Sequence, residues 1–222
     1  MSSEVQRRTI SSEDWRRLLS NVRIPKRQLN QIVMNYLTNE GYREAAEMFS
    51  QESGTDPDID FHSIEERRKI RDAIMIGDID LAIELINELD PDILDSRPDV
   101  NFMLRIQKLV EYIKEGRVSE ALAFGQEILA PAAKGSIELL KELERAMSLL
   151  AFEDLTSSPV GEYVQPGHKQ KVASRVNEAI LESQGRAAQS KLQTLMKLLS
   201  YSQKKLSEVV SFPAIKDLSY QD

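Results

Sequence analysis

The feature that most constrains the fold is an internal repeat, in which residues 70–89 recur 39 positions later along the chain. A glycine followed five residues later by an alanine keeps its place in both copies, as Gly77 with Ala82 and Gly116 with Ala121. Each copy predicts a helix, a glycine that permits a left-handed turn, and a second helix whose alanine allows close approach to the first. The matched positions are Ile70, Ile74, Gly77, Ile79, Ala82, Ile83 and Leu89 in the first copy, and Leu109, Ile113, Gly116, Val118, Ala121, Leu122 and Ile128 in the second.

A weaker third copy precedes these two, because Gly41 and Ala46 have the same separation. Aromatic residues make up only 6% of the chain and charged residues 29%, a balance typical of helices packed on helices. We therefore expect an all-α fold of stacked antiparallel helical hairpins. Hairpins of this kind cannot bury their apolar faces alone, so they stack on neighbours or on other chains.

Several kinds of chemistry are excluded by composition. The chain has no cysteine, so it cannot form a thioester on a thiolate or supply the usual ligands of structural zinc. Its two histidines, His62 and His168, lie far apart in polar, loop-like sequence, and we expect both to be ordinary surface residues. Neither of the common glycine-rich phosphate loops is present. We expect no catalytic residue, no metal and no cofactor.

Charge and hydropathy limit the classes of partner that the chain can bind. The net charge of −7 argues against nucleic acid, and no apolar run approaches the roughly 20 residues that span a bilayer. The first residues lack the order of a secretion signal, so we expect an intracellular protein without membrane contact. From Glu52 to Asp99 there are 15 acidic and 5 basic residues, whereas Gln165 to Leu206 holds 8 basic and 2 acidic. This contrast is typical of solvated helix faces, and it also permits charge-complementary docking with another subunit.

Turn-forming residues divide the chain. Residues 1–10 are polar and expected to be disordered, and residues 11–24 predict a short amphipathic helix with Trp15, Leu18, Leu19 and Val22 on one side. Residues 90–99 and 154–168 are rich in Pro, Gly, Asp and Ser, a composition that predicts connectors between helices. Residues 213–222 form a polar C-terminal tail.

The segment 25–57 carries the most specific motif. Its order, Asn-Tyr-Leu-x-x-x-Gly-Tyr-x-x-Ala-Ala-x-x-Phe, closely resembles the LisH motif, a short helical hairpin that dimerises. Two such short helices bury too little surface to be stable alone, so we expect this hairpin to bind a second copy or another chain. The residues expected to form that contact are Leu29, Ile32, Val33, Asn35, Tyr36, Leu37, Gly41, Tyr42, Ala45, Ala46 and Phe49.

The resemblance covers nearly the whole chain. Residues 61–126 look like the CTLH motif and residues 128–212 like the CRA region, an order that resembles the scaffold subunits of the glucose-induced-degradation (GID/CTLH) ubiquitin ligase complex. The resemblance implies a non-catalytic adaptor that joins a RING-bearing catalytic pair to substrate-recruiting subunits for proteasomal degradation. It also implies a RanBPM-like SPRY subunit and an armadillo-type subunit as partners, and a place in the cytoplasm and nucleus.

Two other classes of function remain open from the sequence. One is a LisH-type homo-oligomeric adaptor of another cytoplasmic assembly. The other is a helical enzyme that uses neighbouring carboxylates, for which the candidate pairs are Asp78 with Asp80 and Glu65 with Glu66.

Overall fold

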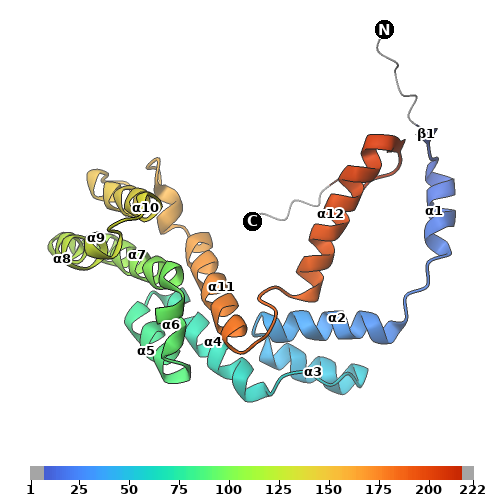
Figure 1. The fold of residues 1–222 in the computed structure, drawn as a ribbon, viewed down its shortest axis with the longest axis horizontal. Coiled ribbons are helices and arrows are strands. Elements are labelled where there is room, and N and C mark those ends of the chain that lie inside the picture. Colours follow the sequence, from blue (N-terminus) through green and yellow to red (C-terminus); the bar gives the residue numbers. More distant parts are fainter. Residues whose placement is uncertain (1–7, 217–222) are drawn as a thin grey trace, which may run out of the picture. The chain divides into compact units, whose positions relative to one another are not determined.

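The computed structural model describes residues 8–216, and their regular structure is helical except for one pair of two-residue strands (Figure 1). The predicted all-α fold is confirmed. The chain forms two compact units, which we call unit 1 and unit 2. Unit 1 combines the chain up to Ile59 with the chain from Gln189 onward, and unit 2 is Asp60–Ala188.

The elements follow one another with short connections. Unit 1 contains β1 (Arg8–Thr9), α1 (Ser12–Ser20), α2 (Lys26–Asn39), α3 (Arg43–Ser53), α12 (Lys191–Val209) and β2 (Val210–Ser211). Unit 2 contains α4 (Phe61–Ile76), α5 (Ile79–Leu89), α6 (Asp92–Ser96), α7 (Pro98–Lys114), α8 (Val118–Phe124), the π-helical turn η1 (Gly125–Leu129), α9 (Ala130–Ala132), α10 (Ile137–Met147), the 3-10 turns η2 (Ser148–Ala151) and η3 (Gly161–Val164), and α11 (Pro166–Ser183).

Unit 1 is built on the hairpin of α2 and α3, with α12 attached to α2 by its first turn. The backbone N–H of Lys191 donates to the Asn35 side-chain oxygen at 2.7 Å, and the Gln193 amide donates to Glu40 at 3.0 Å. We expected residues 128–212 to form one region, whereas the structure places α12 with the N-terminal hairpin and the rest with unit 2.

Both ends of the described chain meet in unit 1. β1 pairs with β2 in parallel, the N–H of Ile10 donates to the carbonyl of Ser211 at 2.8 Å, and the rings of Trp15 and Phe212 lie 5.0 Å apart. The expected disorder of residues 1–10 is therefore wrong for residues 8–10, because β2 supplies backbone partners that the local sequence does not reveal. Residues 1–7, and residues 217–222 of the expected tail, lie outside the described part of the chain.

The repeat has the geometry that its glycines predict. Gly77 and Gly116 have φ angles of 96° and 74°, and the next residue's N–H donates to a carbonyl five positions back at 3.0 and 2.9 Å. Ala82 and Ala121 are fully buried beneath the preceding helices. Gly41, with a φ of 82°, and the buried Ala46 repeat this arrangement in unit 1. All three copies are therefore helical hairpins of one design.

The second copy departs from the first near its end. The helix that starts at Val118 widens into the π-helical turn η1, which inserts extra backbone into the helical repeat. As a result Leu129 is fully buried and Ile128 is exposed, so the predicted match of Ile128 with Leu89 does not hold. Gly125 leaves room in this turn for Met147, whose sulfur would lie 3.0 Å from an added Cβ.

Unit 2 holds two apolar cores, and α7 contributes to both. The first lies among α4, α5, α6, α11 and the start of α7, and includes Ile74, Ile86, Leu104 and Ile180. The second lies among α7, α8, η1, α10 and η2, and includes Leu109, Leu129, Leu149 and Tyr163. Unit 2 therefore has the interior of a self-sufficient domain.

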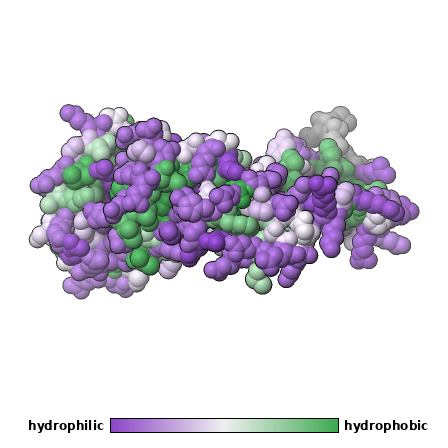
Figure 2. Space-filling view, turned by 90° about the horizontal axis from the view of Figure 1, so that it is seen from below, coloured by the Kyte–Doolittle hydropathy of each residue, from purple (hydrophilic) through white to green (hydrophobic). Residues whose placement is uncertain are grey.

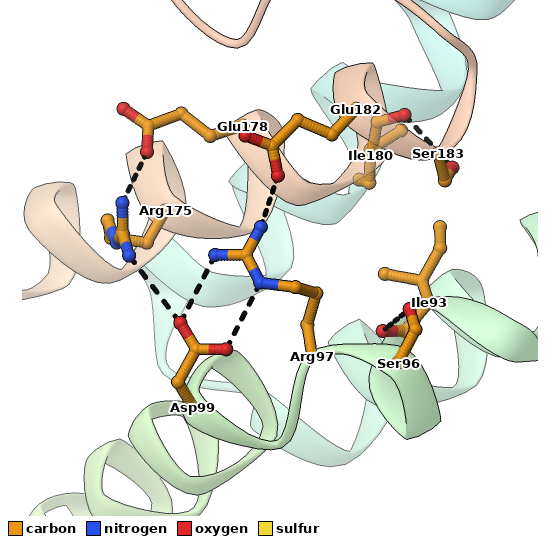
Figure 3. A network of polar contacts seen from close by, with 9 residues as sticks. All are labelled: Ile93, Ser96, Arg97, Asp99, Arg175, Glu178, Ile180, Glu182 and Ser183. Carbon is orange, nitrogen blue, oxygen red and sulfur yellow. Dashed lines mark hydrogen bonds and ion pairs between the residues drawn. The ribbon is translucent and has the colours of Figure 1, made fainter.

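An ion-pair network fastens the corner between α6 and α7 to α11 (Figure 3). Arg97 binds both oxygens of Asp99 at 3.1 Å and also pairs with Glu182 on α11. Arg175 reaches Asp99 at 3.5 Å and Glu178 at 2.7 Å. Hydrogen bonding to Arg97 lowers the pKa of Asp99, which stabilises the ionised form of this partly exposed carboxylate. The 90–99 connector is thus more ordered than predicted, because it contains α6.

Candidate assembly surface

The predicted LisH residues divide into those that build the hairpin and those that face outward. Gly41 and Ala46 are buried at the turn and between the helices. Asn35 uses its side chain to hold the first turn of α12, which sequence reasoning did not anticipate. Half-buried positions are Ile32, Asn35, Tyr36, Leu37 and Phe49, and exposed positions are Leu29, Val33, Tyr42 and Ala45.

The outward set on α2 forms a short apolar stripe. Leu29 and Val33 are one helical turn apart and remain 45% and 40% exposed. Met48 on α3 is more exposed still, at 62%. These side chains are available for contact with another chain, whereas Met34 on the same helix is already buried.

α12 adds a larger apolar face that the site prediction missed. None of its residues is buried, although the helix is 19 residues long and rich in leucine. Leu192, Leu195, Leu198 and Leu199 recur at spacings of three and four residues and are 37–57% exposed. That spacing is legible in the sequence as the pattern of an amphipathic helix, and it could have identified this face.

Helices in water usually owe their stability to an apolar face buried against something else. Burying the exposed part of each of these leucines contributes on the order of 1 kcal/mol to association. We call the exposed apolar side chains of α2, α3 and α12 together the assembly surface: Leu29, Val33, Met48, Leu192, Leu195, Leu198 and Leu199. Its chemistry suits protein binding through apolar contact.

In the face drawn in Figure 2, hydrophilic side chains cover most of the surface and hydrophobic side chains show through in patches. No helix of residues 8–216 combines the length and the apolar character required to cross a membrane.

The histidine prediction is half wrong. His62 is exposed, near Glu66 at 3.4 Å, but His168 is half-buried in the first turn of α11. Its Nδ1 lies 2.7 Å from the side-chain oxygen of Gln107, and its ring lies 4.9 Å from that of Tyr163. Burial lowers the pKa of His168, which favours the neutral ring. The proline and glycine that made this stretch look like a loop instead begin a helix.

Gln107 continues this chain of contacts inward. It is fully buried on α7, and its amide donates to Glu111 at 2.6 Å. Glu111 in turn binds Lys169 at 3.2 Å and Lys114 at 3.0 Å. These polar groups satisfy one another and join α7 to α11, which is a structural role.

The carboxylate pairs that suggested an enzyme have structural partners. Asp78 caps α5 by accepting from the N–H of Leu81 at 3.0 Å, and Asp80 binds Lys108 at 2.6 Å. Glu65 pairs with Arg68 at 2.6 Å, and Glu66 lies beside His62. Within residues 8–216, no group of three His, Asp or Glu side chains is placed to hold a metal ion.

Two family models match the chain, one after the other along the sequence. Residues 28–53 match the LisH model, and residues 63–207 match the model described as the CTLH/CRA domain C-terminal to the LisH motif. The chain belongs to the LisH–CTLH family. The LisH match contains most of α2 and all of α3, and the CTLH/CRA match runs from α4 into α12.

Relatives from distant eukaryotes match this LisH–CTLH chain along almost its full length. Protein GID8 homolog of Arabidopsis thaliana is 43% identical over 213 residues, covering 96% of this chain and 88% of the relative. Glucose-induced degradation protein 8 homolog of Dictyostelium discoideum is 44% identical over 214 residues, covering 96% and 94%. GID complex subunit 8 of Schizosaccharomyces pombe is 33% identical over 204 residues, covering 87% and 85%. The predicted resemblance to subunits of the GID/CTLH complex is confirmed.

Proposed function

We propose that this LisH–CTLH chain is a non-catalytic scaffold subunit of a GID/CTLH-type ubiquitin ligase complex. The names of its near full-length relatives, which include a GID complex subunit, support membership of such an assembly. In this role it joins RING-bearing catalytic subunits to substrate-recruiting subunits, among them a RanBPM-like SPRY subunit and an armadillo-type subunit, for proteasomal degradation of the substrates. It acts in the cytoplasm and the nucleus.

The assembly surface is the observation that carries this proposal. α12 is 19 residues long and has no buried residue, and the LisH hairpin keeps Leu29 and Val33 exposed. Such apolar faces suit a subunit whose packing is completed only when it binds its partners. Unit 2, by contrast, contains two filled apolar cores. The combination favours a scaffold rather than a self-contained enzyme.

Catalysis then belongs to the partners. Without cysteine, this chain cannot accept ubiquitin as a thioester or build a cross-braced zinc RING. Its contribution is proximity: holding catalytic and receptor subunits at a fixed separation raises the effective concentration of substrate near the charged conjugating enzyme.

Charge substitution on α12 tests the proposal. The tagged full chain and its variant Leu195→Asp with Leu199→Asp are purified from cells, and the RING, SPRY and armadillo subunits are quantified by mass spectrometry. Because both leucines are exposed, the variant should keep its helical circular dichroism. Desolvating two carboxylates at an interface should lower recovery of the partners by at least about tenfold.

A matched control carries the same change on unit 2. Ile137→Asp with Leu140→Asp replaces two exposed apolar residues of α10 and should leave recovery unchanged. Full recovery by the folded α12 variant contradicts the assembly surface. Recovery of further copies of this chain alone, without ligase subunits, would establish the homo-oligomeric adaptor instead.

A further inference from the structure

The segment between Trp15 and Asn39 is cationic throughout. It contains five basic residues and no acidic residue. All five are exposed and they gather in its first half: Arg16, Arg17, Arg23, Lys26 and Arg27. We call residues 16–27 the basic arm.

The basic arm also contains large apolar side chains that are exposed. Leu18, Leu19, Val22 and Ile24 are 51–63% exposed, and α1 contains no buried residue. α1 is nevertheless a capped helix, with Ser11 accepting from the N–H of Asp14 at 3.1 Å. Its start is held to the C-terminal segment by the contact of Trp15 with Phe212. α1, which contributes the first part of the arm, is thus a held helix with an uncovered apolar side.

The positive charge is largely unneutralised within the described chain. Arg17 pairs with Asp14 at 3.0 Å, and both side chains are exposed. Among residues 8–216, the other four cations have no ion pair. A partner that covers the apolar side therefore gains if it also carries negative charge, since complementary charge steers association and selects partners.

We propose that the basic arm binds an acidic helical segment of another protein, with apolar side chains of that segment packed on Leu18, Leu19 and Val22. This inference rests on the proposed scaffold function, and it assigns the chemistry of one partner. It extends the assembly surface along the chain, because the arm runs directly into α2 and its exposed Leu29 and Val33.

A second copy of this chain is a poor occupant. If two copies met through this face, each would present the same five cations, and the nearby α12 adds Lys191, Lys197, Lys204 and Lys205 against one acidic residue, Glu208. Like charges placed opposite one another across an interface weaken it.

An anionic membrane is also disfavoured. A helix that lies in the lipid interface commonly inserts an aromatic ring, but Trp15 is half-buried and packed on Phe212 within this chain. The first turn of α1 also carries Glu13 and Asp14, which an anionic surface repels. A protein partner with alternating acidic and apolar residues fits these constraints better.

Zero-length cross-linking identifies the occupant. In the full chain, Arg16→Lys with Arg23→Lys keeps the charge and adds two amines that a carbodiimide couples directly to carboxylates. The assembly is purified with this variant, cross-linked, and mapped by mass spectrometry. We expect links from positions 16, 23 and Lys26 to Asp or Glu of one other subunit, within a segment of helical apolar periodicity.

Charge reversal supplies the quantitative test. Arg16→Glu with Arg23→Glu should lower recovery of that subunit by about tenfold and leave the folding of the chain unchanged. Lys134→Glu with Lys141→Glu, which reverses two exposed lysines of unit 2, is the matched control and should have no effect.

Three results would overturn the inference. The first is cross-linking from position 16, 23 or 26 of a ¹⁴N-labelled copy of this chain to a ¹⁵N-labelled copy, and the second is binding of the full chain to vesicles with about 30% phosphatidylserine that depends on Arg16 and Arg23. The third is unchanged recovery of every subunit by the charge-reversed arm. If the α12 variant loses its partners while that arm variant keeps them, the scaffold function stands and only the arm's role is refuted.

Discussion

At the scale of single residues, two glycines with the same backbone conformation differ in their surroundings. Gly77 and Gly116 both end a helix with a positive φ angle. At Gly116 an added Cβ meets no atom within 4 Å, whereas at Gly77 it would lie 2.8 Å from Glu111 and 2.9 Å from Lys169. At Gly116, only the backbone conformation favours glycine. At Gly77, the conformation favours glycine and the side chains of Glu111 and Lys169 also occupy the space next to it.

Replacing each glycine with alanine separates these two requirements. Gly116→Ala should cost about 1 kcal/mol of unfolding free energy through the left-handed conformation. Gly77→Ala should cost about 1–2 kcal/mol more, because the mostly buried pair of Glu111 and Lys169 must shift. Urea unfolding of both variants measures the difference, and equal losses would show that the pair moves freely.

The residue scale also marks the limit of prediction from sequence. Gly41 and Ala46 could be assigned to the hairpin because their spacing repeats, but the same motif did not reveal which side chains face outward. Asn35 was assigned to an interface and instead binds the backbone of Lys191, a residue 156 positions away. Contacts over such distances leave no local pattern.

At the scale of elements, the hairpins were predictable and the place of α12 was not. Apolar spacing and glycine position are local signals, so they recovered the helices on both sides of Gly41, Gly77 and Gly116. The π-helical turn and the β1–β2 pair depend on packing against distant segments, and they were missed. α12 joins the LisH hairpin through its capped first turn, which includes the fully buried Ser190.

The cap of α12 can be tested by itself. Ser190 accepts from the N–H of Gln193 at 3.2 Å, and the Gln193 side chain accepts from the N–H of Ser190 at 2.8 Å. Ser190→Ala should destabilise α12 by about 1 kcal/mol and speed its amide hydrogen exchange roughly fivefold.

The matching change in unit 2 is Ser136→Ala, which removes the cap of α10 at Leu139. It should speed exchange in α10 and leave α12 unaffected. Faster exchange throughout unit 2 after Ser190→Ala would contradict the assignment of α12 to unit 1.

At the scale of the whole molecule, the two units differ in what they bury. Unit 2 has two apolar cores, whereas α1 and α12 of unit 1 contain no buried residue. The larger buried apolar interior therefore belongs to unit 2.

Dissecting the chain tests this division. Residues 60–188 alone should fold with cooperative thermal unfolding and remain monomeric, because both cores are retained. The full chain should form oligomers at micromolar concentration through its LisH hairpin, because Leu29, Val33 and Met48 are uncovered there. Light scattering measures both. If the fragment formed oligomers, an association surface would have to lie in unit 2. A monomeric full chain would show that the assembly surface does not drive self-association.

The pairing of β1 with β2 sets an order of events during translation. Unit 2 is complete once Ala188 has left the ribosome, but β1 has to wait for Val210 and Ser211, which are made after the whole of unit 2. A nascent chain folds from its N-terminal side as whole domains emerge. Here β1 is made early and finds its partner late, so a chain that stops before Val210 would carry a folded unit 2 while β1 has no strand to pair with.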